Sequence, residues 1–531
     1  MKAHVPWQPH PRQVWGLLAL LMLSAAPHLL RLPLALTGLW LLAVGWRAHL
    51  MLSGQPLPPR LLRLALTLAT GVALYLQFGT VLGREAGSAL LVMMAGLKLL
   101  ELKQRRDAIL LVLLAYLLVA VQFMFSRSPL SATHAVIATL LITTVWIGLD
   151  RRIGATPWRK DLALAARLLA QSVPLMLILF VLFPRLPGPL WSLPSDAHAR
   201  SGLSGEMQPG RISDLALSEA VAFRADFSGP IPPPAQRYWR GPVFEFTDGR
   251  RWWGAGEKAP AFSETPSLET LGTAYRYWLT LEPSGTPWVP TLGMTSSLPA
   301  DVLRLPTLEV RARRNVDALR RDEFVAFTEY RAHTADAAAL MRNLKVPAAL
   351  GARVRQLAQS WRASARNERA IVNAALRHFN TEDFVYTLTP PLLGRDPVDE
   401  FLFETRRGFC EHYASAFTLL MRAAAIPARV VTGYQGGEVN PVGGYLIVRQ
   451  SDAHAWAEVW LTDTGWVRVD PTAAVAPERI EYRIDLDLAR AGDAVHFQFD
   501  DDSALMQSLR RARFALDALN NGWNQWVLSY G

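Results

Sequence analysis

The sequence predicts a bundle of transmembrane helices followed by an aqueous α+β domain, and three observations lead to this fold class. The chain has 531 residues, too many for a single hydrophobic core of ordinary size. Most of its long apolar segments precede Pro184. After Pro184, charged residues, glycine turns and the alternating apolar patterns of a water-soluble protein dominate. We therefore expect two or more structural units, the first of them in a membrane.

The N-terminal third contains seven apolar segments that predict membrane spans. They cover residues 14–30, 32–46, 64–82, 86–100, 108–125, 133–149 and 162–183. The first two are short and interrupted by Pro27, Arg31 and Pro33, so this pair forms either two spans or a tight hairpin that barely crosses. The predicted anchor, residues 1–184, thus holds about seven helices or five, and a linker over residues 185–210 follows.

Basic residues in the predicted loops indicate the orientation. The loops on the side of the N-terminus are rich in Arg and Lys, whereas the opposite loops carry only Arg31, Arg84 and Arg127. The positive-inside rule makes the first set cytoplasmic, and an odd number of spans then places the chain after Pro184 on the far side. No A-x-A type cleavage site separates the segments, so we expect them to remain as anchors.

The formal net charge of +10 does not indicate nucleic-acid binding. Many basic residues lie in loops between apolar segments, and the sequence has no run of five Lys or Arg and no nucleic-acid-binding motif. Lys98 and Arg167 lie near the cytoplasmic ends of their predicted helices, where long side chains reach the headgroups. These features favour an anchor over a channel or transporter.

The soluble region begins with a β-rich stretch and continues with helices followed by strands. Residues 211–335 contain short alternating segments and a hairpin turn at Asp248-Gly249, which predict a small β domain. From residue 336 the pattern becomes helical, and a helix is expected to begin at about Cys410. Strands are predicted over residues 428–434, 445–449, 453–461 and 466–469. Residues 336–485 therefore predict an α+β core, before an amphipathic segment over residues 486–531.

Cys410 is the single cysteine of the sequence, so no intrachain disulfide is possible. It follows the flexible residue Gly408 and opens a predicted helix. Free N–H groups and the dipole at a helix N-terminus stabilise a thiolate, the reactive form of cysteine. A lone thiol is a liability in an oxidising compartment, which favours a reactive role over that of a small apolar filler. Cys410 is the candidate nucleophile.

A cysteine nucleophile needs a base, and His454 is the preferred histidine. His412 lies two residues after Cys410, about 200° around the same helix, and its side chain points away. His454 opens a predicted strand whose alternation places it on one face with Trp456 and Glu458. A single histidine is more often structural than catalytic, but the cysteine, the strand and a nearby acid together favour catalysis.

Asp470 ends the next predicted strand, where a carboxylate can hold the imidazole tautomer and stabilise its cation. The alternative is a turn-forming aspartate before proline. A two-residue turn at residues 463–464 sets Asp470 opposite Ala457 and not opposite His454. The pairing therefore requires either a wider loop or a β-bulge that shifts the register.

Four segments in order resemble the transglutaminase-core family, specifically its bacterial inner-membrane, TgpA-like branch. They are Arg406-Arg-Gly-Phe-Cys410-Glu-His-Tyr-Ala-Ser-Ala-Phe417, Ile426-Pro-Ala-Arg-Val-Val-Thr-Gly-Tyr434, Asp452-Ala-His-Ala-Trp-Ala-Glu-Val-Trp460 and Trp466-Val-Arg-Val-Asp470-Pro-Thr472. The multi-helix anchor before them is also similar to that branch, so the resemblance covers nearly all of the chain.

The resemblance implies a papain-like fold with a Cys-His-Asp triad at Cys410, His454 and Asp470, acting in the periplasm. It implies attack of the thiolate on protein glutamine side chains, release of ammonia and transfer of the acyl group to a lysine amine, with no metal and no cofactor. Trp456 is a candidate wall of the active site, although an aromatic residue on a buried strand is more often core. The implied partners are a glutamine donor, a primary-amine acceptor and the lipid bilayer.

Two other functions stay open. Water in place of the amine makes the enzyme a cysteine peptidase or glutamine deamidase with the same triad. A non-catalytic membrane scaffold that binds peptide or cell-wall material would not need Cys410.

The C-terminal end has an amphipathic pattern that predicts a helix either on the membrane surface or against the core. The pattern consists of Leu505, Leu509, Leu516, Leu519, Trp523 and Trp526. Members of the resembling branch usually continue into a further transmembrane helix and a small domain, whereas this sequence stops at Gly531, so one reading is that the chain is truncated.

Overall fold

The computed structural model describes residues 10–80, 83–126, 128–150, 157–182, 203–208, 215, 218–254, 267–333, 336–477 and 504–529. The chain divides into two compact units. The helical unit comprises Met1–Ala199 and Leu519–Gly531, and the α+β unit comprises Arg200–Ala518. Each unit has its own hydrophobic core, as expected for a chain of this length.

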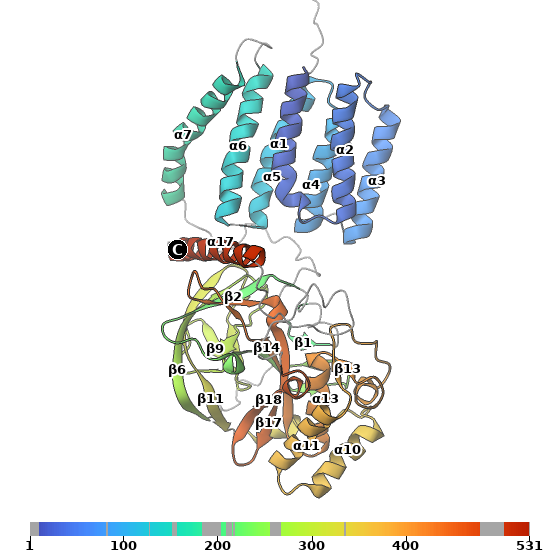
Figure 1. The fold of residues 1–531 in the computed structure, drawn as a ribbon, viewed down its shortest axis with the longest axis vertical. Helices are drawn as coiled ribbons and strands as arrows, with labels where there is room; N and C mark the ends of the chain where they lie inside the picture. Colours follow the sequence, from blue (N-terminus) through green and yellow to red (C-terminus); the bar gives the residue numbers. More distant parts are fainter. Residues whose placement is uncertain are drawn as a thin grey trace, which may run out of the picture. The chain divides into compact units, whose positions relative to one another are not determined.

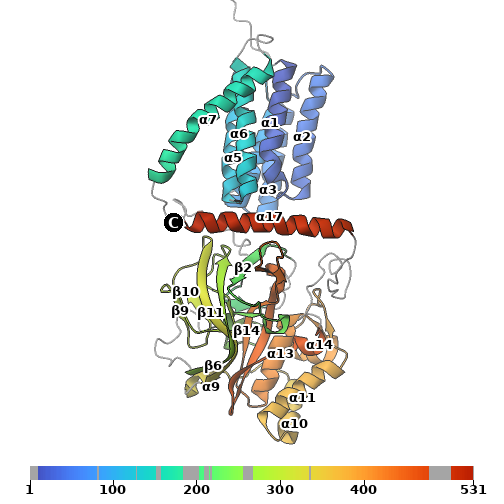
Figure 2. The same ribbon diagram turned by 60° about the vertical axis from the view of Figure 1, so that its left-hand side comes forward.

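Each of the seven predicted apolar segments forms a helix in the described part of the helical unit. These helices are α1 (Pro11–Leu29), α2 (Leu34–Leu52), α3 (Arg60–Phe78), α4 (Arg84–Leu99), α5 (Arg105–Val121), α6 (Pro129–Asp150) and α7 (Trp158–Leu182). The first six run side by side, whereas α7 contacts α6 and leans away from the others (Figure 1, Figure 2).

Five of the described helices are long and apolar enough to cross a membrane: α2, α3, α5 with the turn that follows it, α6 and α7. The outer side of α3 shows what these helices expose, because Leu64, Leu68, Val72 and Leu76 are each more than half exposed. A continuous apolar surface of this kind is unfavourable in water and suits lipid chains.

Two antiparallel sheets organise the α+β unit. The strand order is β15-β16-β2-β6-β11-β8 in the six-stranded sheet and β18-β17-β14-β3-β7 in the five-stranded sheet. The strands are β2 (Val221–Phe227), β3 (Tyr238–Phe244), β6 (Ser267–Leu281), β7 (Thr291–Leu292), β8 (Met294–Thr295), β11 (Arg320–His333), β14 (Ala428–Gln435), β15 (Glu438–Val439), β16 (Leu446–Arg449), β17 (Ala453–Leu461) and β18 (Gly465–Val469).

The predicted small β domain over residues 211–335 is not a separate domain. β3 and β2, which come from this range, pair with β14 and β16 of the predicted core. Every residue of β3 is buried, so this strand needs packing partners on both of its faces. Alternation in the sequence shows that strands exist but not which strands they join. The range therefore supplies strands to the same two sheets as residues 336–485.

Short strands complete the unit. They are β1 (Glu206–Met207), β4 (Phe246–Thr247), β5 (Trp252–Trp253), β9 (Val302–Arg304), β10 (Val310–Ala312), β12 (Val385–Tyr386) and β13 (Arg407–Gly408). β4 and β5 pair across the predicted turn, where Gly249 has φ of +98°. This conformation favours glycine, so the hairpin prediction is confirmed.

Except for the first in sequence, the helices over residues 336–477 lie on one side of the α+β unit, away from β6 and β11 (Figure 1, Figure 2). The α-helices of this range are α9 (Ala337–Arg342), α10 (Ala352–Ser364), α11 (Glu368–Thr381), α12 (Pro397–Glu400), α13 (Cys410–Ala423) and α14 (Thr472–Val475). α13 begins at Cys410 as predicted, and it is buried from Cys410 to Arg422 because it packs against β14, β17 and α10. This central helix positions the candidate nucleophile.

Candidate active site

The side chain of His412 caps the start of α13. Its Nδ1 accepts a hydrogen bond from the backbone N–H of Phe409, the N-cap residue, at 3.2 Å. Burial lowers the pKa of His412 to about 4, so the ring is neutral near pH 7 and can accept this bond. The imidazole of His412 therefore serves as a cap of α13, which agrees with its exclusion as the base.

Cys410 follows this cap as the first residue of α13, and its side chain is fully buried. The approach to it is tightly packed at Gly408. A Cβ atom at this position would lie 2.6 Å from the ring of Phe401 and 2.8 Å from the Cβ of His412. Both distances are shorter than side chains tolerate, so close packing requires glycine two residues before the thiol.

His454 and Asp470 lie in direct contact. The Nε2 atom of His454 is 2.8 Å from Oδ2 of Asp470, and both side chains are buried. The Nδ1 atom of His454 is also buried and has no hydrogen-bond partner among the described residues. Because the carboxylate accepts a hydrogen bond from the N–H at Nε2, this geometry favours the tautomer in which Nδ1 carries a lone pair.

The turn between β17 and β18 explains this contact. Leu461 pairs with Gly465, so the loop has three residues, and Gly465 follows it with φ of +82°. The next register positions are regular up to Val469, and Asp470 therefore stands opposite Trp456 and diagonally across from His454. Of the two alternatives left by the sequence, the wider loop is confirmed and no bulge is needed.

Tyr238 is a site residue that the sequence did not reveal. Its hydroxyl donates a 2.8 Å hydrogen bond to Oδ2 of Asp470, and the backbone N–H of Thr472 donates to Oδ1 at 3.0 Å. Burial alone would raise the pKa of Asp470, but the charge and hydrogen bond of His454, together with these two donors, hold it below its usual value. Tyr238 reaches the site because β3 pairs with β14.

Trp456 packs beside the pair. Its ring stacks on His454 with centroids 6.4 Å apart and meets Tyr238 edge-on at 5.4 Å. On β14, Gly433 stands opposite His454, and a Cβ there would lie 2.0 Å from the carbonyl oxygen of Trp239. The aromatic rings and this close backbone approach hold the imidazole in place.

Glu458 lies on the same face of β17 and forms a second buried cluster. Both of its oxygens bond the guanidinium of Arg240, and Nε of Arg429 donates to Oε2 at 2.9 Å. Burial would raise the pKa of Glu458, but the two arginines outweigh burial and hold the pKa below its usual value. This carboxylate is satisfied by charge pairing and is structural.

The structure thus brings three of the four predicted residues together, namely His454, Asp470 and Trp456. Cys410 comes from α13, which packs against the strand that carries His454. The sequence signal for Tyr238 was weak, because a tyrosine in an aromatic β-strand is usually a core residue. Only the pairing of distant strands identifies it.

Two family models match the chain. Residues 16–327 match the TgpA N-terminal domain, and residues 355–471 match the transglutaminase-like superfamily. The first match extends from the helices through β2, β3 and β6 and includes the first eight of the fourteen residues of β11.

Individual proteins agree with these models. The chain is 41% identical over 531 residues to the protein-glutamine gamma-glutamyltransferase of Pseudomonas aeruginosa, a match that covers 98% of this chain and 78% of that protein. The crystal structure of the periplasmic domain of TgpA from the same organism is 42% identical, covers 53% of this chain and 97% of that one, and has a TM-score of 0.50. An uncharacterized Bacillus subtilis protein, YebA, is 38% identical over 138 residues, covering 25% of this chain and 19% of that protein.

The N-terminal model alone spans more than half of the sequence, and the Pseudomonas relative matches almost all of it. On these grounds the chain belongs to the TgpA family, in which a TgpA N-terminal domain precedes a transglutaminase-like core.

Proposed function

We propose that this protein is a protein-glutamine γ-glutamyltransferase, anchored in the inner membrane, with Cys410, His454 and Asp470 as its catalytic triad. The observation that carries the proposal is the 2.8 Å contact between Nε2 of His454 and Oδ2 of Asp470, which leaves Nδ1 able to accept a proton. A histidine that acts as the base for a cysteine needs one ring nitrogen that a hydrogen bond holds in place and a second ring nitrogen that can accept a proton. The name of the Pseudomonas relative supports the same reaction.

In the first half of this reaction, Nδ1 of His454 takes the proton of the Cys410 thiol. The thiolate attacks the carboxamide carbon of a glutamine side chain, and the C–N bond breaks. Ammonia leaves with the proton held by the imidazolium, and a thioester remains on Cys410. Asp470 stabilises the imidazolium throughout, and the N-terminal N–H groups of α13 stabilise the thiolate.

In the second half, His454 takes a proton from a primary amine such as that of lysine. The amine nitrogen attacks the thioester carbon, the C–S bond breaks, and an isopeptide bond forms as the thiolate is regenerated. Trp456, stacked on His454, forms one wall of the site and keeps water from the imidazole. Exclusion of water favours the amine as acceptor over hydrolysis.

The proposal places the helical unit in the bilayer and the α+β unit in the periplasm. Its support is the exposed apolar side chains of α3, the basic loops on the N-terminal side and the periplasmic source of the related crystal structure. The proposed division is an anchor over residues 1–184, a linker over 185–210 and a catalytic core over 336–485 that is completed by the strands of 211–335. Residues 486–531 form a C-terminal segment.

The test is mass spectrometry of the full chain in lipid nanodiscs, incubated with a glutamine-containing protein and a primary-amine probe. We expect probe mass on glutamine with the unchanged protein and none with Cys410→Ala or His454→Gln. His412→Gln is the matched control, because glutamine keeps the hydrogen bond to Phe409 and should leave labelling unchanged.

Other outcomes would replace the proposal. Cleaved substrate, or glutamine converted to glutamate without probe, identifies a peptidase or deamidase that uses the same cysteine. No covalent change with any protein substrate, combined with retained cellular function of Cys410→Ala, identifies a binding scaffold.

A further inference from the structure

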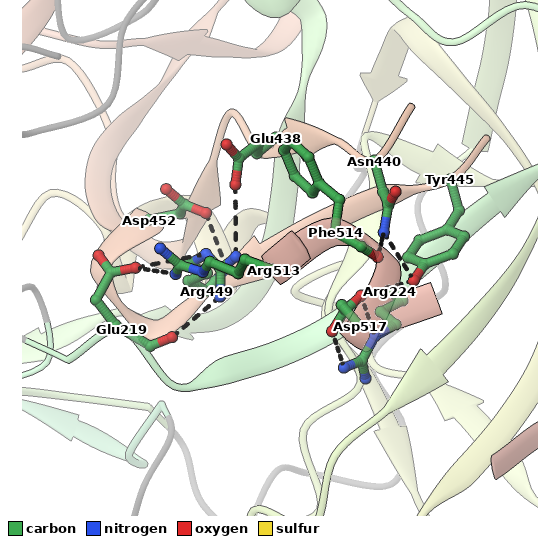
Figure 3. Close-up of polar contacts among 10 residues, drawn as sticks. All are labelled: Glu219, Arg224, Glu438, Asn440, Tyr445, Arg449, Asp452, Arg513, Phe514 and Asp517. Atoms are coloured by element: carbon green, nitrogen blue, oxygen red, sulfur yellow. Dashed lines mark hydrogen bonds and ion pairs between the residues drawn. The ribbon is translucent and has the colours of Figure 1, made fainter. Parts of the chain in front are cut away.

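The helix α17 (Ala504–Ser529) is attached to the α+β unit by an ion pair between buried Arg224 and partly buried Asp517 (Figure 3). Nε and Nη2 of Arg224 donate to the two carboxylate oxygens of Asp517 at 3.2 and 2.5 Å. The hydroxyl of Tyr445 donates to the same carboxylate at 2.6 Å. Burial would raise the pKa of Asp517, but the hydrogen bonds and charge of Arg224 outweigh it and hold the pKa below its usual value. Ionised Asp517 is the centre of the attachment.

Phe514 and Arg513 extend this contact by one turn (Figure 3). The ring of Phe514 is buried with Tyr445 and Ile447, and its backbone carbonyl accepts a 3.0 Å hydrogen bond from the side chain of Asn440. Arg513 pairs with Glu219 at 2.7 Å. Removing one partner of a largely buried charge pair is costly, so the segment of α17 from Arg513 to Asp517 is held on the α+β unit.

The other side of α17 is apolar and exposed. Leu516, Leu519 and Trp523 are 58%, 61% and 36% exposed. At 3.6 residues per turn these three positions share one face, and Phe514 lies about 160° around the helix from Leu516. In the sequence the same spacing continues at Leu505, Leu509 and Trp526. The helix therefore has one face docked on protein and one apolar face exposed over at least two turns.

The exposed surface beside this apolar face is cationic. Arg511 is exposed and the side chain of Arg513 is 53% exposed, whereas residues 504–516 contain no acid. α17 is not among the candidate membrane spans found in the described residues. An apolar stripe bordered by arginines is typical of helices that lie in the plane of a membrane interface.

We infer that α17 is an interfacial helix whose exposed face inserts between the headgroups of an anionic bilayer. The inference rests on the proposed membrane location, since the helical unit of the same chain brings a bilayer within reach. Lipid fits this face better than a protein partner does, because the arginines complement anionic phosphates and Trp523 suits the headgroup level. The exposed face therefore needs no change in the contacts of Arg513, Phe514 and Asp517 with the α+β unit in order to meet lipid.

Because α17 is attached to residues close to the active site in the chain, contact of α17 with lipid would also affect the position of the active site. Asn440 and Tyr445 precede β16, and the short turn Gln450–Asp452 leads from β16 to His454 in β17. An interfacial α17 therefore sets the orientation of the triad relative to the bilayer. The substrates that this orientation favours are protein glutamines close to the membrane surface.

The test takes advantage of the fact that Cys410 is the single native cysteine, because its replacement leaves any introduced cysteine as the one site for labelling. In a Cys410→Ala background, an environment-sensitive fluorophore is attached to Leu516→Cys in the full chain, reconstituted in vesicles that contain phosphatidylglycerol and lipids with a nitroxide near the headgroup. We expect nitroxide quenching at position 516 at least fivefold stronger than at Leu392→Cys, a fully exposed position of the α+β unit. Quenching should weaken in zwitterionic vesicles and in an Arg511→Gln variant.

Ile137→Cys, an exposed position of α6, reports separately on the membrane location. If position 137 is quenched by lipid nitroxide while position 516 is open to aqueous iodide, the interfacial helix is wrong and the membrane anchor stands. If position 137 is also unquenched, both fail. Energy transfer between labelled copies, with position 516 shielded but unquenched by lipid, overturns the inference in favour of a second copy of the chain.

A separate experiment distinguishes failure of this inference from failure of the proposed function. Leu516→Glu/Leu519→Glu should reduce crosslinking of a vesicle-tethered glutamine peptide about tenfold relative to a soluble peptide, with Leu392→Glu as the surface control. Loss of labelling of both peptides would contradict the inference, because the triad itself would then depend on α17.

Discussion

The two ends of β17 bury ionisable side chains on the same face of one strand but pair them differently. At the later end, Glu458 is fully bonded by Arg240 and Arg429. Near the N-terminal end of β17, Asp470 bonds Nε2 of His454, and Nδ1 of the imidazole has no hydrogen-bond partner among the described residues. Complete pairing makes the Glu458 cluster structural, whereas the ring nitrogen that remains able to accept a proton suits the His454 pair to its proposed role in catalysis.

Asp470→Asn gives the largest expected effect and tests the reactive end. The amide favours the wrong tautomer of His454, so we expect kcat for amine incorporation to fall by about three to four orders of magnitude. The temperature of unfolding should change by only a few degrees. A variant that unfolds at room temperature, or one that retains a tenth of the activity, would contradict the assignment of Asp470 as the orienting acid.

Glu458→Gln tests the structural end. It removes the carboxylate that bonds both buried arginines, and we expect a loss of about 3–5 kcal/mol in the free energy of unfolding. Denaturant titration of the full chain in detergent measures this loss, and kcat of the folded fraction should stay within about threefold. The matched control is Glu438→Gln, since Glu438 forms a more exposed pair with Arg449 at 3.4 Å and should cost less than about 1 kcal/mol.

Glu309 is a buried residue just before β10, and its carboxyl group accepts a 2.7 Å hydrogen bond from the backbone N–H of Val243. His412 and Glu309 should make the stability depend on pH with opposite signs. Burial lowers the pKa of His412 to about 4, so its contribution to stability is present above pH 6.5 and is lost as the pH falls from there towards 4, with about 3 kcal/mol at stake. Burial raises the pKa of Glu309 to about 7, so its contribution is present below pH 4.5 and is lost as the pH rises through 7.

Unfolding measured between pH 4 and 8 separates the two groups. His412→Gln should remove the acid-side loss, and Glu309→Gln the neutral-side loss, because each glutamine keeps the acceptor for the backbone N–H of Phe409 or Val243. Unchanged pH profiles in both variants would show that neither group titrates differently in the folded chain.

Tyr238→Phe gives the smallest effect and refines the reactive end. It removes one of the donors to Asp470, so we expect kcat to fall about tenfold, equivalent to about 1.4 kcal/mol. The acid limb of the kcat profile should move to higher pH, because the carboxylate loses a group that favours its charged form. A lowered temperature of unfolding with an unchanged pH profile would instead indicate a purely structural tyrosine.

Much of the local structure was predictable because it depends on neighbouring residues. The start of α13 at Cys410, the strand from Ala453 to Leu461 and the seven apolar helices follow from periodicity. The assignment of residues 211–335 as a separate domain was not supported, since β2 and β3 pair with strands some two hundred residues later. Such pairings depend on which buried faces meet in space.

The sequence by itself determined the order of the helices and strands, the apolar character of the first third and the choice of Cys410, His454 and Asp470 as candidates. Each depends on composition or local spacing. Only the tertiary structure decided the three-residue loop that brings Asp470 to His454, the hydrogen bond from Tyr238 and the two faces of α17. These depend on strand register and on buried contacts between distant segments, which local patterns do not contain.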